Sequence, residues 1–114
     1  MERIDKYLPL KENNEHFTHL KVSVTYSLGG YNYWYSQNTP RGYYLNVMPV
    51  ELSESMGHKM ESYHLLSNYS GLKFLLKEVK RQSKTREQEA IEIAEQKMDE
   101  YANIVLNQCG LELA

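Results

Sequence analysis

Residues 28–50 read LGGYNYWYSQNTPRGYYLNVMPV and contain the only tryptophan of the chain. The paired glycines near the start of this stretch suit the positive φ values of a turn. Pro40 and Gly42 indicate a loop before the chain becomes extended again. Because strand patterns enter and leave the stretch, we predict a hairpin that carries an aromatic loop.

Strand patterns flank this hairpin on both sides. Over residues 20–28 apolar and polar side chains alternate strictly, and only a period of two places all the apolar ones on one face. Residues 43–52 alternate in the same way, although Pro49 cannot donate a ladder hydrogen bond and so predicts an edge position or a bulge. A third, less regular strand is expected over residues 58–66.

Helical patterns follow the strands. The first helix is predicted from apolar residues at i, i+3, i+4 and i+7, which are Leu72, Leu75, Leu76 and Val79. The last helix is expected from about residue 86 to residue 108, with Gly110 suited to its C-terminal stop. Its narrow apolar seam consists of Ile91, Ala94, Met98, Tyr101 and Val105. Such a seam serves either a helix pair within the chain or a coiled-coil dimer.

These patterns predict an α+β fold: a three-stranded antiparallel sheet followed by two C-terminal helices packed on one face. At 114 residues, with 41% apolar and 25% charged residues, the chain is expected to form one domain over residues 16–114. Residues 1–15 mix charges with Pro9 and are expected to form an N-terminal arm. The net charge of -2 argues against a generally basic nucleic-acid coat protein.

Cysteine usage and hydropathy predict a cytoplasmic protein, and the resemblance described below implies a bacterial host. The one cysteine, Cys109, cannot form an internal disulfide, which fits a reducing compartment. The opening residues carry charges of both signs and lack the apolar core of a secretory signal. No apolar run approaches the roughly 20 residues that span a bilayer. We therefore expect no membrane contact.

Aromatic residues are concentrated in the hairpin: Tyr31, Tyr33, Trp34, Tyr35, Tyr43 and Tyr44. They are too many for one face of a small sheet to bury. Tyrosine and tryptophan often anchor protein interfaces and also stack on exposed bases. We predict a partner-binding surface of these residues and Arg41, whose guanidinium suits a carboxylate or phosphate. The alternative is a satellite core that holds the loop, with Arg41 bonded to carbonyls.

Two neighbouring segments carry opposite charge. The first contains the basic residues Lys73, Lys77, Lys80, Arg81, Lys84 and Arg86, and residues 87–100 are mainly acidic. Bases suit the C-terminal end of one helix and acids the N-terminal half of the next, so the simplest interpretation is two solvated helix faces. The functional alternatives are a basic stripe that binds nucleic-acid phosphates and an acidic face that mimics DNA.

Residue patterns for metal binding and catalysis are weak. His16 and His19 would lie on opposite faces of a strand, and His58, His64 and Cys109 lie elsewhere, whereas zinc needs four N or S ligands. Cys109 lies near a helix C-terminus, where the dipole raises the pKa of a thiol. Gly29-Gly30 lacks the lysine and helix of a phosphate loop. We expect no metal, no cofactor and no enzymatic activity.

The segments GGYNYW (29–34) and RGYYLNVMPV (41–50) resemble small accessory proteins of phages and conjugative elements in Firmicutes and their neighbours. LLKEVKR (75–81) is similar to a stretch that those proteins carry after their strands. The resemblance covers roughly residues 20–95 and brings no catalytic residues. It implies a setting in which short proteins are often counter-defence factors, including anti-CRISPR proteins that bind a host nuclease or sequester its signal.

The leading hypothesis is a non-enzymatic binding protein, monomer or homodimer, that inhibits a host defence protein such as a CRISPR nuclease. Its contact surface would be the aromatic hairpin, with the acidic helix face second. The alternative is a nucleic-acid-binding accessory protein that uses Lys73, Lys77, Lys80, Arg81 and Lys84 with the hairpin tyrosines. A third hypothesis, a protein that sequesters a nucleotide signal, requires a pocket that sequence cannot show.

Overall fold

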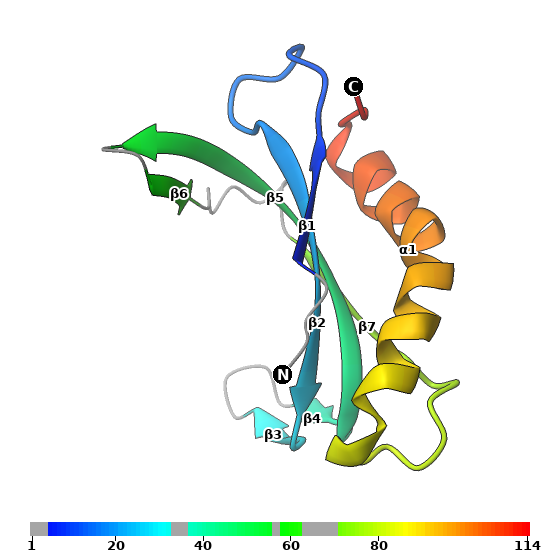
Figure 1. Ribbon diagram of the computed structural model, residues 1–114. Coiled ribbons are helices and arrows are strands. Elements are labelled where there is room, and N and C mark those ends of the chain that lie inside the picture. The colour runs from blue at the N-terminus through cyan, green and yellow to red at the C-terminus, as the bar shows by residue number, and fades with distance from the viewer. Residues whose placement is uncertain (1–4, 33–36, 56–57, 63–70) are drawn as a thin grey trace.

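The main sheet is antiparallel and carries one long helix on one of its faces (Figure 1). The computed structural model describes residues 5–32, 37–55, 58–62 and 71–114. The strands are β1 (Asp5–Pro9), β2 (His19–Ser27), β3 (Gly30–Asn32), β4 (Gln37–Thr39), β5 (Gly42–Ser55), β6 (His58–Ser62) and β7 (Leu72–Leu75). A short 3-10 helix, η1 (Lys84–Arg86), leads into the helix α1 (Glu87–Cys109).

The order of the main sheet is β1-β2-β5, and β6 and β7 share the outer side of β5. β6 pairs with residues 51–55 and β7 with residues 44–47. β3 and β4 form a separate hairpin beyond the ends of β2 and β5, which confirms the predicted hairpin. Gly29 at its base has φ +78, and a Cβ there would lie 2.8 Å from the Thr39 carbonyl oxygen. Only glycine fits this bend.

The core lies between the sheet and α1. The two central strands contribute fully buried side chains: Leu20, Val22, Val24, Leu45 and Val47. The helix buries one stripe, made of Ala90, Ile91, Ala94, Met98, Ala102, Val105 and Leu106. Phe74 of β7 stacks on Tyr101 of α1, with ring centroids 4.1 Å apart. The predicted alternation of the two central strands is therefore confirmed.

The predicted helix over residues 72–81 does not form, and the predicted three-stranded sheet with two helices is wrong. Leu72–Leu75 is instead β7, with Leu72 and Phe74 packed against the core. β5 is 14 residues long, and β6 covers only its C-terminal part. Without β7 the backbone groups of residues 44–47 would lack partners on one side, which costs free energy. The neighbouring strand thus selects the extended conformation.

The last helix is confirmed, and α1 lies within one residue of its predicted ends. Gly110 adopts the left-handed conformation, with φ +66, and its N–H donates to the Leu106 carbonyl as a C-cap. The predicted seam packs on the sheet. A helix pair within the chain is therefore wrong, because residues 72–81 supply no second helix. In the described part of the chain, no helix combines the length and apolar character needed to cross a bilayer.

β5 is an internal strand, although Pro49 predicted an edge position or a bulge. Pro49 lies opposite Leu20 of β2, between the residues that pair with β7 and those that pair with β6. Within the described residues neither outer strand pairs with β5 at this point. The missing N–H of proline is tolerated because it falls in this gap.

The predicted N-terminal arm differs from the structure, and the third predicted strand is confirmed as far as the described residues reach. Residues 5–9 of the expected N-terminal arm form β1 at the edge of the sheet, paired with residues 19–23. The third predicted strand is confirmed over residues 58–62 as β6, and residues 63–66 lie outside the described chain.

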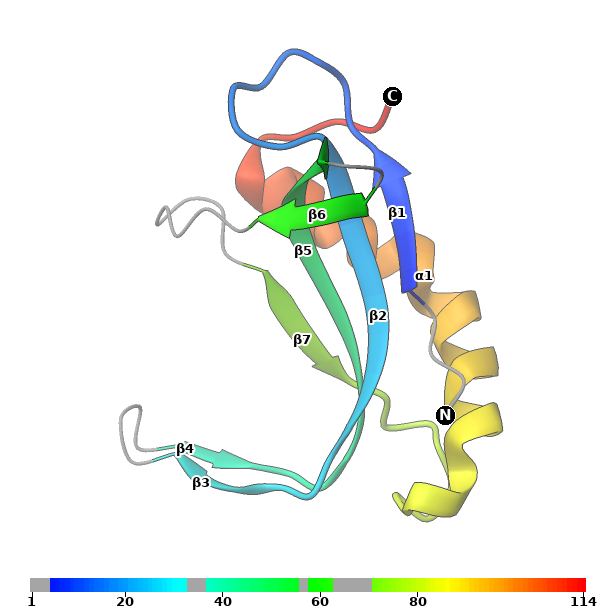
Figure 2. The same ribbon diagram turned by 60° about the vertical axis from the view of Figure 1, so that its left-hand side comes forward.

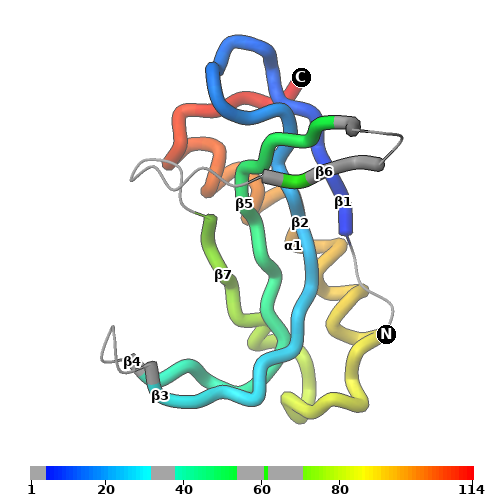
Figure 3. The backbone as a smooth tube through the Cα atoms, turned by 90° about the vertical axis from the view of Figure 1, so that its left-hand side faces the viewer, coloured from blue at the N-terminus to red at the C-terminus, as the bar shows by residue number. Residues whose placement is uncertain are grey.

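The second face of the main sheet, here called the open face, is not covered by α1 (Figures 2 and 3). The β3–β4 hairpin and the β5–β6 hairpin project on this side, at opposite ends of the sheet. By strand register, its central side chains are Tyr7, Lys21, Ser23, Thr25, Tyr44, Asn46, Met48 and Lys73.

Candidate binding surfaces

The predicted aromatic surface lies only partly within the described residues. Tyr33, Trp34 and Tyr35 fall outside them. Tyr31 is in β3, and 47% of its surface is exposed. Its hairpin extends away from the body of the protein (Figure 2). Tyr31 is therefore accessible to a partner.

Tyr43 and Tyr44 lie on opposite faces of β5 and are both buried, at 1% and 7% exposure. The Tyr43 hydroxyl donates to the Lys84 carbonyl (2.8 Å), and the Tyr44 hydroxyl donates to the Pro40 carbonyl (2.6 Å). Burial raises the pKa of both phenols, and the Glu87 carboxylate adds to the rise in the pKa of Tyr43. These two rings hold loop residues in place and offer little surface to a partner.

Arg41 stands at the base of the β3–β4 hairpin and is exposed. Its Nε–H donates to the Tyr26 hydroxyl (2.6 Å), and its guanidinium carbon lies 5.9 Å from the centroid of the Tyr26 ring. The Tyr26 and Tyr43 rings pack with centroids 4.9 Å apart. Since Tyr43 bonds to Lys84, a continuous chain of contacts links the hairpin base to the start of α1.

The basic residues do not form the predicted helical stripe. Lys73 lies on β7, Lys77, Lys80 and Arg81 lie in the connection after it, and Lys84 lies in η1. All five side chains are exposed. No ion pair involves any of them among the residues that the structure describes.

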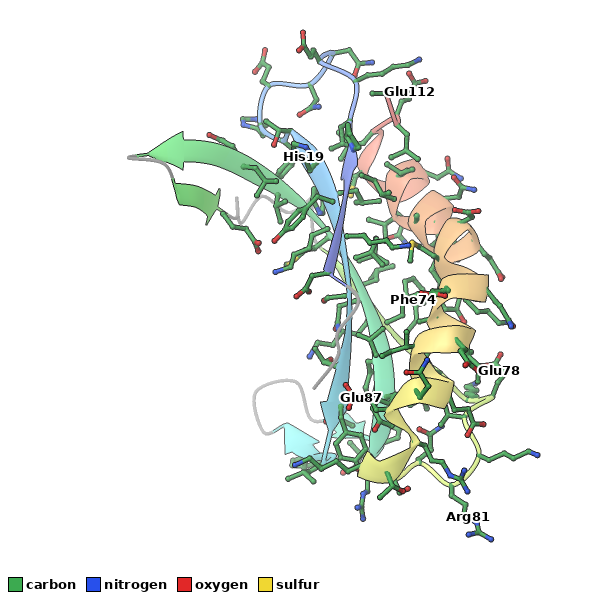
Figure 4. The ribbon with its side chains drawn as sticks, in the orientation of Figure 1. His19, Phe74, Glu78, Arg81, Glu87 and Glu112 are labelled. Atoms are coloured by element: carbon green, nitrogen blue, oxygen red, sulfur yellow. The ribbon has the colours of Figure 1, made fainter. Side chains whose placement is uncertain are left out.

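We call Lys77, Lys80, Arg81 and Lys84 the basic segment. The acid within it, Glu78, pairs with Lys97 of α1 (3.0 Å), and this hydrogen bond lowers the pKa of Glu78. The basic segment lies at the same end of the molecule as the β3–β4 hairpin (Figures 1 and 2), and the Arg81 side chain points away from the body (Figure 4). The fold thus gathers Arg41 and the basic segment at one end.

A polar network that we did not predict crosses the open face. The two carboxylate oxygens of Glu61, on β6, accept hydrogen bonds from the Tyr7 hydroxyl (2.6 Å) and the Lys21 ammonium (2.9 Å). The bond to Glu61 raises the pKa of Tyr7. Lys21 and Glu61 are both largely buried, with side chains 18% and 19% exposed. No sequence signal indicates this network, because its members come from three strands far apart in the chain.

The surface of the described chain contains hollows that could hold a ligand. One, of about 290 Å³, lies on the open face between β2, β5 and β7, with Lys21 and Lys73 among its lining residues. Another, of about 510 Å³, lies beside the loop between β1 and β2 and includes Glu12, Glu15 and His16. Sequence periodicity could not reveal either hollow: the first is formed by side chains of three strands that only pairing brings together, and the second depends on the conformation of the loop over residues 9–19 beside β5.

The groups considered for metal binding or catalysis are dispersed. His16 and His19 both line the larger hollow, but within the described residues no three His, Cys, Asp or Glu side chains are arranged to hold a metal ion. The side chains of His58 and His64 lie outside the described part. Burial raises the pKa of the Cys109 thiol, which keeps it protonated near neutral pH.

The described side chains therefore offer groups for binding: an exposed tyrosine, a guanidinium fixed by a phenol, and exposed ammonium groups. They lie at the hairpin end and on the open face. Comparisons with known proteins assign no family, because no family model, no curated protein and no solved structure matches this chain.

Proposed function

We propose that this chain is a non-enzymatic binding protein of a mobile genetic element that inhibits a host defence effector, in the manner of an anti-CRISPR protein. The contact would be a protein–protein interface at the β3–β4 hairpin. One observation carries the proposal: Tyr31 is exposed on a hairpin that projects from the body, with Arg41 held at its base. The mobile-element setting rests on the resemblance of residues 29–50.

The local structure suits an interface for physical reasons. An exposed tyrosine supplies a large contact area at a small cost in conformational entropy. Arg41 is already oriented by its bond to Tyr26, so it loses less freedom on binding. The buried Tyr43 and Tyr44 hold the strand that supports the hairpin. A supported strand that presents an exposed tyrosine is typical of an anchored protein contact.

We expect Tyr31→Ala to weaken binding to the protein partner by about tenfold or more, since truncating a hot-spot anchor side chain costs about 2 kcal/mol or more and about 1.4 kcal/mol is tenfold in affinity. The partner is first captured from a nuclease-treated lysate of a bacterium that carries CRISPR nucleases, and its affinity for purified variants is then measured by calorimetry.

The matched control is Ile104→Ala, because Ile104 is also an exposed apolar residue, at 37%, but lies on α1. The Ile104→Ala variant should bind the protein partner with the same affinity as the unmodified protein. Arg41→Lys keeps the charge and loses the planar fork, so it should weaken binding less than Tyr31→Ala. Equal affinities for Tyr31→Ala and Ile104→Ala would rule out the hairpin as the interface.

A second candidate function, nucleic-acid binding, is favoured by the gathering of Arg41 and the basic segment at one end of the molecule. Exposed lysines and arginines neutralise phosphates and release counterions, so their affinity falls log-linearly with salt. An exposed tyrosine such as Tyr31 can stack on an unpaired base. This arrangement suits single-stranded DNA or RNA better than a duplex groove.

If this second function holds, reversing Lys77, Lys80 and Arg81 to glutamate should abolish binding of a single-stranded oligonucleotide at physiological salt. In the unmodified protein log K should fall with log salt at a slope of roughly -0.7 for each phosphate neutralised. Fluorescence anisotropy across a salt series measures both quantities.

The single reversal Lys6→Glu serves as the charge control, because Lys6 is exposed on β1, away from the basic segment. Oligonucleotide binding that survives the triple reversal would exclude the basic segment. Protein-partner binding should be unaffected by the triple reversal, which separates the two candidate functions.

A further inference from the structure

The hollow on the open face has the chemistry of an anion site, and this is independent of the hairpin interface. Its volume of about 290 Å³ is near the lower end of small-molecule pockets, with room for roughly ten water molecules. Three adjacent strands line it. Ser23, Asn46 and Lys73 stand in one row across β2, β5 and β7, and Lys21 and Met48 form the next row.

Lys73 supplies the charge of this hollow. Its side chain is exposed and lines the hollow, and it has no ion pair among the described residues. Lys21 lies across the hollow, and its position is fixed by the bond to Glu61 (2.9 Å). Because the Glu61 charge is balanced by Lys21, the ammonium of Lys73 leaves the hollow positively charged.

Hydrogen-bond donors complete the anion site. The amide nitrogen of Asn46 donates to the Thr25 hydroxyl (2.9 Å) and the Ser23 carbonyl (3.3 Å). The Thr25 hydroxyl oxygen accepts this bond, so the hydroxyl hydrogen of Thr25 points away from Asn46 and can be donated to another acceptor. The Ser23 hydroxyl belongs to the same row as Lys73. An ammonium with neighbouring hydroxyl donors matches the oxygens of a phosphate group.

The remaining wall is apolar and closely packed. Met48 and Leu72 line it, and the backbone at Gly71 approaches so near that a Cβ there would lie 2.5 Å from the Met48 Cβ. A wall of this kind suits the non-polar body of an organic molecule, and the volume of about 290 Å³ limits the size of the occupant. The hollow favours a compact ligand over an extended chain.

We propose that this hollow binds a small organic phosphate, with Lys73 as its counter-charge and the hydroxyls of Thr25 and Ser23 as hydrogen-bond donors. Adenosine monophosphate is the probe, with inorganic phosphate and uncharged adenosine beside it. In titrations followed by backbone amide NMR, adenosine monophosphate should shift the signals of residues 21–25, 46–48 and 71–73 saturably. Inorganic phosphate should shift the same signals at higher concentration, and adenosine should bind at least about tenfold more weakly.

Two variants test the assigned contacts. Lys73→Gln should weaken binding of adenosine monophosphate by about tenfold or more, and Thr25→Val, which keeps the branched shape of a strand residue, should weaken it severalfold. The matched control Lys77→Gln removes an exposed lysine outside the hollow and should change nothing.

The proposal is overturned if neither adenosine monophosphate nor inorganic phosphate gives saturable shifts up to roughly 10 mM, a range that covers weak millimolar sites. Equal binding of adenosine and adenosine monophosphate, or full affinity in Lys73→Gln, would also contradict it. Tyr31→Ala should leave phosphate binding unchanged, so this test and that of the hairpin interface fail independently.

Discussion

Replacing Leu45 by alanine is expected to lower the free energy of unfolding by about 3–4 kcal/mol. Leu45 is fully buried near the start of β5, between Val24 of β2 and Phe74 of β7. Its side chain belongs to the core between sheet and helix, where strands on both sides limit collapse of the cavity. Small domains are stable by only about 5–15 kcal/mol, so this loss is a large share.

The matched control for this variant is Leu28→Ala, because Leu28 is 77% exposed. The same chemical change there should alter the free energy of unfolding by less than about 0.5 kcal/mol. Urea denaturation followed by circular dichroism measures both variants. Similar losses in the two would mean that Leu45 does not lie in the core.

We expect Gln82→Ala to cost about 2–3 kcal/mol of stability, because partly buried backbone groups lose their partners. The Gln82 side-chain oxygen accepts from the Tyr43 N–H (3.1 Å), and its amide nitrogen donates to the carbonyls of Leu76 (2.7 Å) and Val79 (3.3 Å). The amide thus continues the pairing of β5 beyond the end of β7. It also fixes the connection that carries the basic segment.

Gln96→Ala is the control for this change, since Gln96 is exposed on α1 and alanine is a good helix former. Its stability should equal that of the unmodified protein or exceed it slightly. Hydrogen exchange adds a local measurement: the Tyr43 amide should exchange faster in Gln82→Ala than expected from the loss of global stability alone. An unchanged exchange rate of the Tyr43 amide would show that its hydrogen bond to the Gln82 side chain does not protect it.

Gln82 also explains the glycine at position 42, which sequence patterns associated only with a loop before the second strand. Gly42 has φ +149, and a Cβ at this position would contact the side-chain oxygen of Gln82. The close approach of Gln82 and the conformation of Gly42 are therefore parts of one arrangement. It positions the end of β5 next to the base of the β3–β4 hairpin.

The two proposed binding surfaces depend on this framework in different ways. Arg41 is held by Tyr26, which packs on Tyr43, so the hairpin base relies on the core. The hollow relies on the pairing of β2, β5 and β7 and on the Glu61 network. Stability measurements on every binding variant therefore distinguish a lost contact from a lost fold.

For the proposed binding surface, the sequence predicts which types of residue take part but not where the fold places them. The density of aromatic residues singled out the hairpin, and Tyr31 is exposed there. Composition could not separate it from Tyr43 and Tyr44, because only the fold buries these two side chains on β5 and leaves Tyr31 exposed on the β3–β4 hairpin. The basic residues are exposed, as a solvated charged segment would be, but they do not lie on a helix. Because residues 72–75 form β7, Lys73 lies on a strand and the other basic residues lie in the connection and the 3-10 helix that follow. Lys73 consequently lies apart from the basic segment, in the hollow.

The amino-acid sequence by itself determined the elements whose signals are local: the strict alternation in β2 and β5, the glycine bend before the hairpin, and the helix α1 with its cap at Gly110. Each of these signals depends only on residues that are close in sequence. The apolar residues repeat every two residues in a strand and every 3.6 residues in a helix, and a glycine allows a positive φ at its own position. The tertiary structure alone decided the state of residues 72–75, the placement of Pro49 and the Glu61 network. In each case the deciding interaction is made with a partner strand: the unpaired edge of β5 required β7, the gap between β6 and β7 accommodated Pro49, and the curvature of the β5–β6 hairpin brought Glu61 to Tyr7 and Lys21.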